Sequence, residues 1–388
     1  MALVIPDDTS APGTHALVIG ISAYRHLAGG TQPTPAGIET GMQQLRSAAR
    51  SASDVAQWLQ ARPYRAPLPP LRSLRVLLSP GEGEVIADGY RDPDALRATR
   101  THVEQALAGF WQVCRAHRDN HAIVYVAGHG IQLNKTGAVL LLEDFAAPER
   151  LQRLWGALDL AALQLAFNSA EAPRHQFWFV DACRQLPAVA RQFENLLGGA
   201  LSLDVPRLGS AESSLLLLSA ITGTAAYGLP GGRSLFAEAL LQTLSDGAAA
   251  EGPNDDLPDH WHVSVNGLLA TLPKRVREAA RLLGREQSLE AAGMPLPAVF
   301  HVYPEIPKAQ LTVSLQPEAA AASAQLTLRE LRDEGLVPVP TGAGWPNTST
   351  VDAGLYQLEV AAPAPYQAYR KKLSVKPPLT LHSARVQP

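Results

Sequence analysis

Six continuous runs of apolar residues, each about as long as one β-strand, alternate with segments of helical periodicity over residues 15–303. The runs are His15–Ile21, Ser73–Ser79, His121–Ala127, Ala138–Leu142, Gln176–Val180 and Ser214–Ser219. Continuous rather than alternating apolar residues are typical of strands covered on both faces by helices. The chain is therefore expected to be an α/β protein with a six-stranded, mostly parallel sheet.

The helical segments between these runs carry apolar residues on one face. They are expected over residues 47–61, from a cap at Asp92, over 158–167, from a cap at Ser234 to 244, and from a cap at Asn266 to 283. The stripe of the second segment includes Val103, Leu107 and Phe110 and ends at Cys114. We interpret Cys114 as an inert core thiol.

The pattern changes after Tyr303, where Pro304 and Pro307 interrupt the chain. Short segments of alternating polar and apolar residues follow, at 311–315, 325–328 and 355–360. This pattern predicts a small all-β, sandwich-like domain over residues 305–388. Residues 1–14 are interpreted as a polar N-terminal tail.

Composition narrows the functional classes. Of 388 residues, 46% are hydrophobic and 18% are charged, a composition that suits a large core. The net charge of −3 argues against nucleic acid as a partner. We expect no membrane span, since no apolar stretch reaches roughly 18 residues, and no signal peptide. Two cysteines suit a reducing compartment, so the cytoplasm is expected.

Two short motifs follow the third and fifth apolar runs. Val126–Gly130 (VAGHG) contains His129 between glycines, and Val180–Arg184 (VDACR) contains Cys183. Ligands of open α/β sheets bind beyond the carboxyl ends of the strands, where both residues are expected. A histidine base and a cysteine nucleophile suffice for a cysteine protease. The alternatives are a histidine that only ends a strand and a redox-sensing thiol, which usually needs a resolving cysteine nearby.

A histidine about 50 residues upstream of the cysteine is the caspase arrangement. Residues 16–21 resemble the first strand of that fold, Ser53-Asp54-Val55 its next helix, and residues 213–247 its small-subunit half. Over residues 15 to about 300, the chain resembles caspase-like cysteine peptidases of the caspase–metacaspase group. The resemblance implies the caspase–haemoglobinase fold, with a large-subunit-like part (15–190), a linker (184–213) and a small-subunit-like part (214–303).

The resemblance also implies the chemistry. His129 would help to generate the Cys183 thiolate, which would attack a peptide carbonyl and form a thioester. The backbone N–H groups of Gly130 and Cys183 would hold the oxyanion. No carboxylate is assigned as a third catalytic residue.

Substrate specificity is expected to follow the metacaspases. Asp181, two residues before the cysteine, and Asp54 match acidic positions that bind a P1 arginine or lysine there. Ala127 departs from the family, which often has serine two residues before the histidine. Tyr227 and Gly228 are expected to line the substrate groove. Two alternatives stay open: Asp181 only orients its loop, or the pocket accepts uncharged P1 residues.

Two features that regulate relatives, cleavage of a linker and calcium binding, bear on this chain. The linker 184–213 is either cut on maturation, with Arg191 and Arg207 as candidate sites, or an uncut loop. Calcium activates many metacaspases, but Glu143-Asp144 supplies few of the six to eight oxygens that calcium requires. We therefore expect no metal and no cofactor.

The resemblance implies a regulated bacterial protease acting on a protein substrate, in antiphage defence or programmed cell death, for example by activating a gasdermin-like effector. The C-terminal domain would bind an activator or an operon-encoded partner. The alternative is a catalytically latent scaffold that uses the same fold to bind proteins.

Overall fold

The computed structural model describes most of the chain, in two compact units. The described residues are 3–90, 97–133, 138–148, 154–168, 171–184, 200–201, 213–221, 223–229, 231–255, 257–294, 298–332 and 334–388. The first unit comprises Met1–Leu241 and Leu272–Val299, and the second comprises Gln242–Thr271 and Phe300–Pro388. Residues 242–271 thus group with the C-terminal strands, which a division at residue 303 does not anticipate.

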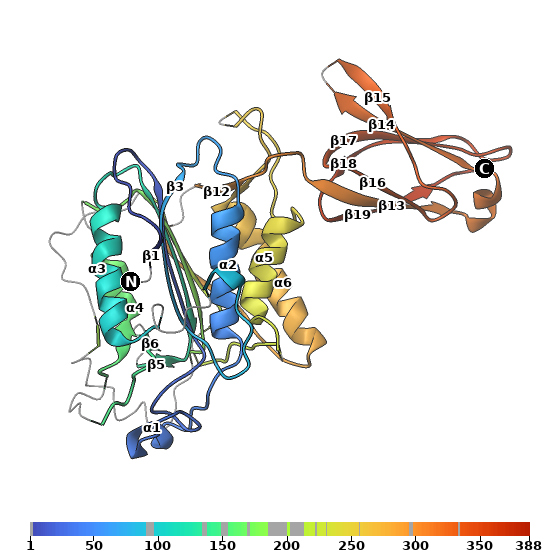
Figure 1. Cartoon of the computed structure of the whole chain (residues 1–388). Coiled ribbons are helices and arrows are strands. Elements are labelled where there is room, and N and C mark those ends of the chain that lie inside the picture. The colour runs from blue at the N-terminus through green and yellow to red at the C-terminus, as the bar shows by residue number, and fades with distance from the viewer. Residues whose placement is uncertain are drawn as a thin grey trace. The chain divides into compact units, whose positions relative to one another are not determined.

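A seven-stranded sheet forms the centre of the first unit (Figure 1). Its order is β1 (Leu3–Ile5), β3 (Leu71–Ser79), β2 (Thr14–Ile21), β4 (His121–Gly128), β8 (His175–Ala182), β9 (Ser213–Leu218) and β11 (Glu290–Met294). The five inner strands are parallel, and the edge strands β1 and β11 are antiparallel to their neighbours. The predicted mostly parallel α/β sheet is confirmed.

The predicted membership of that sheet is wrong at three strands. The run at 138–142 forms β6 (Ala138–Leu141) in a separate antiparallel sheet with β5 (Gly130–Gln132) and β7 (Ala157–Asp159). It is buried there as well, and burial alone does not tell one sheet from another. The two edge strands were not predicted: β1 lies in the segment expected to be a tail, and the alanines and glycine of β11 give little strand signal.

Helices cover both faces of the sheet (Figure 1). On one face lie α3 (Arg100–Cys114) and α4 (Leu160–Ala166). On the other lie α2 (Ala48–Ala61) and the parts of α5 (Leu235–Ser245) and α6 (Val265–Leu282) that belong to the first unit. The described part of α3 is capped by Thr99, whereas Asp92 lies outside the described residues. Cys114, the last residue of α3, is fully buried as predicted.

Two short helical segments precede α3. The helix α1 (Pro35–Glu39) lies in the long connection between β2 and α2. A 3-10 turn, η1 (Asp88–Tyr90), follows β3.

The C-terminal part of the second unit contains two sheets. One has the order β16 (Asn347–Asp352), β13 (Lys308–Gln316) and β19 (Leu379–Arg385). The other has the order β15 (Gly335–Val339), β14 (Gln325–Arg332), β17 (Gly354–Ala361) and β18 (Tyr369–Val375). Buried side chains of both sheets, such as Leu311 and Leu358, share one core. The predicted sandwich-like β-structure is therefore present, and the alternation along β13 and β17 is what places these side chains inside.

Three smaller elements also lie wholly or largely in the second unit. A pair of short strands, β10 (His262–Ser264) and β12 (Val299–Val302), leads into the C-terminal strands. A 3-10 turn, η3 (Glu318–Ala322), connects β13 and β14.

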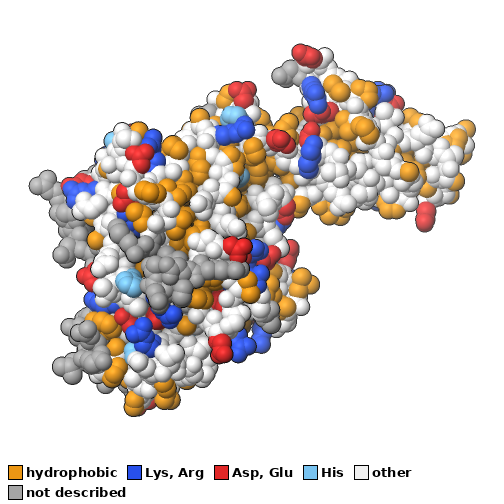
Figure 2. Space-filling view, viewed as in Figure 1, with side chains coloured by type: hydrophobic (Ala, Val, Ile, Leu, Met, Phe, Trp, Pro, Cys, Tyr) orange, Lys and Arg blue, Asp and Glu red, His pale blue; other side chains and the backbone are white. Residues whose placement is uncertain are grey.

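Charged side chains of both signs are interspersed on the face seen in Figure 2. No helix in the described part of the chain is long and apolar enough to cross a membrane.

Candidate active site

The two motifs meet at one edge of the central sheet. Strands β4 and β8 are parallel neighbours, and their register pairs Ala127 with Asp181 and Gly128 with Ala182. The next residue of each strand is His129 and Cys183, respectively, so both leave the sheet at its carboxyl edge. The expected juxtaposition of these two residues thus follows from the strand register.

His129 is held by two residues of the segment that follows β2. Its backbone N–H donates a hydrogen bond to the Tyr24 hydroxyl at 2.6 Å, and the two rings lie 4.9 Å apart. The imidazole Nε2 lies 2.6 Å from the backbone carbonyl oxygen of Gln43. Because a carbonyl only accepts, this contact assigns the proton to Nε2 and leaves the Nδ1 lone pair available to take a proton.

Burial disfavours the charged form of His129 and lowers its pKa below the ordinary value, although the hydrogen bond to Gln43 opposes this effect. The imidazole is therefore neutral at pH 7. A neutral imidazole is the form that accepts a proton from a thiol.

Cys183 is partly buried next to the segment that follows β9. Its Sγ accepts a hydrogen bond from the Ala226 amide at 3.2 Å and donates to the Ala226 carbonyl at 3.5 Å. Burial raises the pKa of the Cys183 thiol, against the effect of the Ala226 amide. Both shifts, in His129 and in Cys183, favour a neutral thiol and a neutral imidazole over an ion pair in the free protein.

Glycines allow the backbone to approach closely at this site. A Cβ atom on Gly130 would lie 2.3 Å from the Cys183 carbonyl oxygen, and one on Gly128 would lie 2.7 Å from the Tyr24 hydroxyl. Neither position has room for a side chain. The two backbones proposed to form the oxyanion hole, those of Gly130 and Cys183, are thus in contact.

A small pocket opens beside the Cys183 thiol. It brings together three of the residues expected to bind substrate, Asp181, Tyr227 and Gly228, and the expected nucleophile Cys183. Ser47 and Ser234 also line it. Ala127 is buried within β4 and is not part of this lining.

Asp181 is the carboxylate of this pocket. It is almost completely buried and accepts hydrogen bonds from the Tyr125 hydroxyl, at 2.9 Å, and from the Ser234 hydroxyl. Burial raises its pKa, although the two hydroxyl donors oppose that shift. Within the described part of the chain Asp181 forms no ion pair, and a buried carboxylate that is only hydrogen-bonded attracts a cation strongly.

Asp54 lies elsewhere, on α2. Its carboxylate accepts a hydrogen bond from Arg233 Nε at 2.6 Å, and Arg50 lies 3.9 Å away. The residues that line the pocket do not include Asp54. The structure therefore brings Asp181 to Cys183 but pairs Asp54 with arginines of the chain itself.

The caspase domain of the peptidase C14 family matches residues 14–290. The chain belongs to the caspase-domain family. Among solved structures, caspase-1 from Spodoptera frugiperda is 12% identical, with a TM-score of 0.40, over 77% of this chain and 94% of that chain. That likeness gives no residue correspondence, and none of the curated proteins matches. The predicted family and caspase-like fold are confirmed, and membership supports a cysteine peptidase in general.

Sequence reasoning about this caspase domain missed two residues that contact His129. Tyr24 comes three residues after β2, and a tyrosine in a connecting segment carries no specific signal. Gln43 contributes its backbone carbonyl, which any residue type would supply. Only the folded chain reveals these two contacts.

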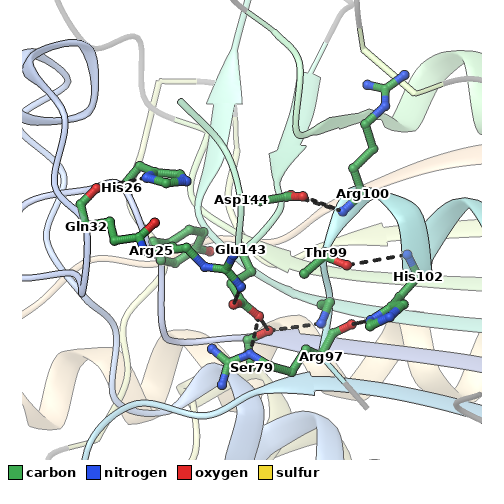
Figure 3. Close-up of polar contacts among 12 residues, drawn as sticks. Arg25, His26, Gln32, Ser79, Arg97, Thr99, Arg100, His102, Glu143 and Asp144 are labelled. Atoms are coloured by element: carbon green, nitrogen blue, oxygen red, sulfur yellow. Dashed lines mark hydrogen bonds and ion pairs between the residues drawn. The ribbon is translucent and has the colours of Figure 1, made fainter. Parts of the chain in front are cut away.

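The acidic pair considered for calcium has other partners (Figure 3). Glu143 is fully buried and accepts hydrogen bonds from Arg25 at 3.0 Å, Arg97 at 2.6 Å and Ser79 at 2.7 Å. Asp144 accepts from the Arg100 amide at the start of α3. Two arginines on a single carboxylate form a cationic surrounding, which does not fit a calcium site.

The predicted linker falls largely outside the described residues. Both candidate cleavage sites, Arg191 and Arg207, lie outside the described residues. Autocleavage stays a prediction.

Proposed function

We propose that this chain is a cysteine endopeptidase in which Cys183 is the nucleophile and His129 the general base. The observation that carries the proposal is the Gln43 carbonyl contact, which leaves Nδ1 of a neutral imidazole as the proton acceptor. That imidazole and the thiol leave neighbouring parallel strands at the same edge of the sheet. Membership of the caspase-domain family supports a cysteine peptidase in general.

In the proposed reaction, the Cys183 thiol turns from the Ala226 carbonyl and gives its proton to Nδ1 of His129. The thiolate attacks the peptide carbonyl carbon, and the oxyanion is held by the N–H groups of Gly130 and Cys183. The imidazolium then protonates the leaving amine as the C–N bond breaks. Water hydrolyses the thioester and restores the thiol. No cofactor takes part.

For the P1 residue we favour arginine or lysine, bound by Asp181. The support is the buried carboxylate at 2.9 Å from Tyr125, in the pocket that also holds Cys183. We do not assign Asp54 to the P1 site, because its carboxylate is paired with Arg233. An uncharged P1 residue is the alternative outcome.

The test is cleavage of a fluorogenic peptide library varied at P1. The wild-type chain is compared with Cys183→Ala and with Cys114→Ala, which removes the buried thiol as a matched control. Hydrolysis after Arg or Lys that is lost only in Cys183→Ala supports the enzyme and the pocket together. Equal hydrolysis by Cys183→Ala contradicts Cys183 as the nucleophile, and no hydrolysis by the wild type favours the catalytically latent scaffold.

We also propose a biological role. The family resemblance favours a cytoplasmic protease regulated in defence or programmed cell death, with a protein such as a gasdermin-like effector as substrate. The C-terminal sheets would bind its activator or another partner. Cleavage of candidate substrates encoded beside this chain, by the wild type and not by Cys183→Ala, tests that role.

A further inference from the structure

A second cavity lies on the histidine side of the candidate active site. It is lined by residues 23–25, 28–31, 43–46 and 80–82 and by Arg97. Tyr24 and Gln43, the two residues that contact His129, both line it. Leu45 lines this cavity and the pocket beside Cys183. The two hollows are thus neighbours that share Leu45.

Three arginines line this cavity: Arg25, Arg46 and Arg97. Glu82 is the carboxylate in the lining, and Glu143 lies behind it, bound to Arg25 and Arg97. The three arginines and the two glutamates together carry a net charge of +1. The cavity is therefore cationic, in contrast to the neighbouring pocket of Asp181.

The buried Glu143 also holds two of these arginines in position (Figure 3). Its side chain is 0% exposed, whereas those of Arg25 and Arg97 are 39% and 32% exposed. One carboxylate thus orients two guanidinium groups, each still partly open to solvent. Arginines fixed in this way lose little side-chain entropy when they bind a carboxylate.

Arg46 adds the third positive charge. It is exposed, and within the described part of the chain it makes no hydrogen bond or ion pair. A substitution at Arg46 therefore changes the charge of the cavity without removing a contact that holds the fold.

We propose that this cavity is a subsite for an acidic side chain of the protein substrate, located after the scissile bond. The inference rests on the proposed peptidase function. The leaving amine takes its proton from His129, so the residues that follow the scissile bond pass the histidine side of the site. There the chain presents a cationic cavity, while the residue before the bond meets the carboxylate of Asp181. The preferred substrate carries a basic residue at P1 and an aspartate or glutamate within the next few positions.

The test is equilibrium binding of fluorescent peptides to the Cys183→Ala chain, which removes turnover from the measurement. The peptides carry arginine at P1 and a single Glu, or a matched Gln, at each of the four positions after it and at the second to fourth positions before the scissile bond. We expect a Glu after the bond to bind about three- to fivefold more tightly than Gln at low ionic strength, with less advantage at high salt.

Three further variants show whether the tighter binding of the Glu peptides depends on the charge of Arg46. It is lost when Arg46→Gln is added to Cys183→Ala and reversed with Arg46→Glu. It persists with Arg281→Glu, which makes the same charge change at an exposed residue in the last turn of α6. Equal binding of Glu and Gln peptides overturns the proposal. So does an equal effect of Arg46→Glu and Arg281→Glu, or an advantage confined to positions before the scissile bond.

Cleavage of the same peptides by the wild-type chain is measured in a separate assay, which tests the proposed peptidase activity. Selective binding of Glu peptides without any cleavage contradicts the proposed peptidase and leaves an anion-selective peptide site. Cleavage that does not depend on Glu contradicts the subsite and leaves the peptidase. The two failures are therefore distinguishable.

Discussion

The hydroxyl oxygen of Tyr24 lies 2.6 Å from the backbone nitrogen of His129 and accepts its hydrogen bond, while donating its own proton to the Ile21 carbonyl at 3.2 Å. The same tyrosine is tied to Gln44, whose side chain accepts from the Tyr24 amide at 2.6 Å and donates to its carbonyl at 3.0 Å. Gln44 follows Gln43, the residue whose carbonyl contacts Nε2. One segment thus fixes both the backbone and the ring of His129.

Replacing Tyr24 by phenylalanine removes the acceptor for the His129 amide and keeps the ring. We expect kcat to fall about tenfold, the equivalent of one hydrogen bond, with little change in KM, because the imidazole is less well positioned. Steady-state kinetics on a P1-arginine peptide measures both constants. Tyr90→Phe is the matched control, since Tyr90 is a buried tyrosine that donates to Gln60 away from this site. Unchanged kcat in Tyr24→Phe would contradict the positioning role.

The pH dependence of activity and of thiol alkylation follows from the pKa shifts of His129 and Cys183. Burial lowers the pKa of His129, so the base becomes protonated, and activity is lost, only below the ordinary histidine range. Burial raises the pKa of Cys183, so alkylation of the free protein by iodoacetamide should accelerate into the alkaline range. Rates of alkylation are measured between pH 5 and 10 in Cys114→Ala. A rate that is already maximal at neutral pH would indicate a preformed thiolate–imidazolium pair instead.

Glu143 is expected to stabilise the fold in a pH-dependent way. Burial raises its pKa, but hydrogen bonds from Arg97, Ser79 and Arg25 outweigh this and hold the pKa below its ordinary value. A carboxyl with a depressed folded-state pKa contributes stability that is complete above its unfolded pKa and is lost as the pH falls through the folded one.

Glu143→Gln should therefore reduce the free energy of unfolding at pH 7 by about 2–3 kcal/mol, a buried-pair value discounted for the partly exposed arginines. Urea denaturation at pH 7 and pH 4 checks the sign. The difference between variant and wild type should shrink at the lower pH, and a difference that grows there would contradict the role of this carboxylate.

Asp181 and Asp54 should differ in their effect on specificity. Asp181→Asn keeps acceptors for Tyr125 and Ser234 but removes the charge from the pocket, so the preference for P1 Arg over P1 Gln should fall at least about tenfold. Asp54→Asn should change that ratio little, because its charge is already paired with Arg233. Ratios of kcat/KM for matched peptides give both values. The reverse ranking would move the P1 site to Asp54.

The sequence predicted those features that depend on local chemistry. The family and the position of both residues at the sheet edge were predicted from three features. These are the glycines around His129, the apolar runs before His129 and before Cys183, and the spacing between the two residues. The sequence did not distinguish β6 from a strand of the main sheet, because Val139 and Leu140 of β6 are as fully buried as the central residues of the main-sheet strands. Tyr24 and Gln43 escaped prediction because their roles depend on a connecting segment folding back over His129. The partner of Asp54, Arg233, lies 179 residues further along the chain.

The most direct test of the Cys183–His129 dyad is intact mass spectrometry after incubation with an acyloxymethyl ketone peptide that carries arginine at P1. We predict one adduct, on Cys183, absent in Cys183→Ala, formed at least about tenfold more slowly in His129→Ala, and unaffected in Cys114→Ala. An adduct on Cys114, or an equal rate of labelling in His129→Ala, would contradict the dyad.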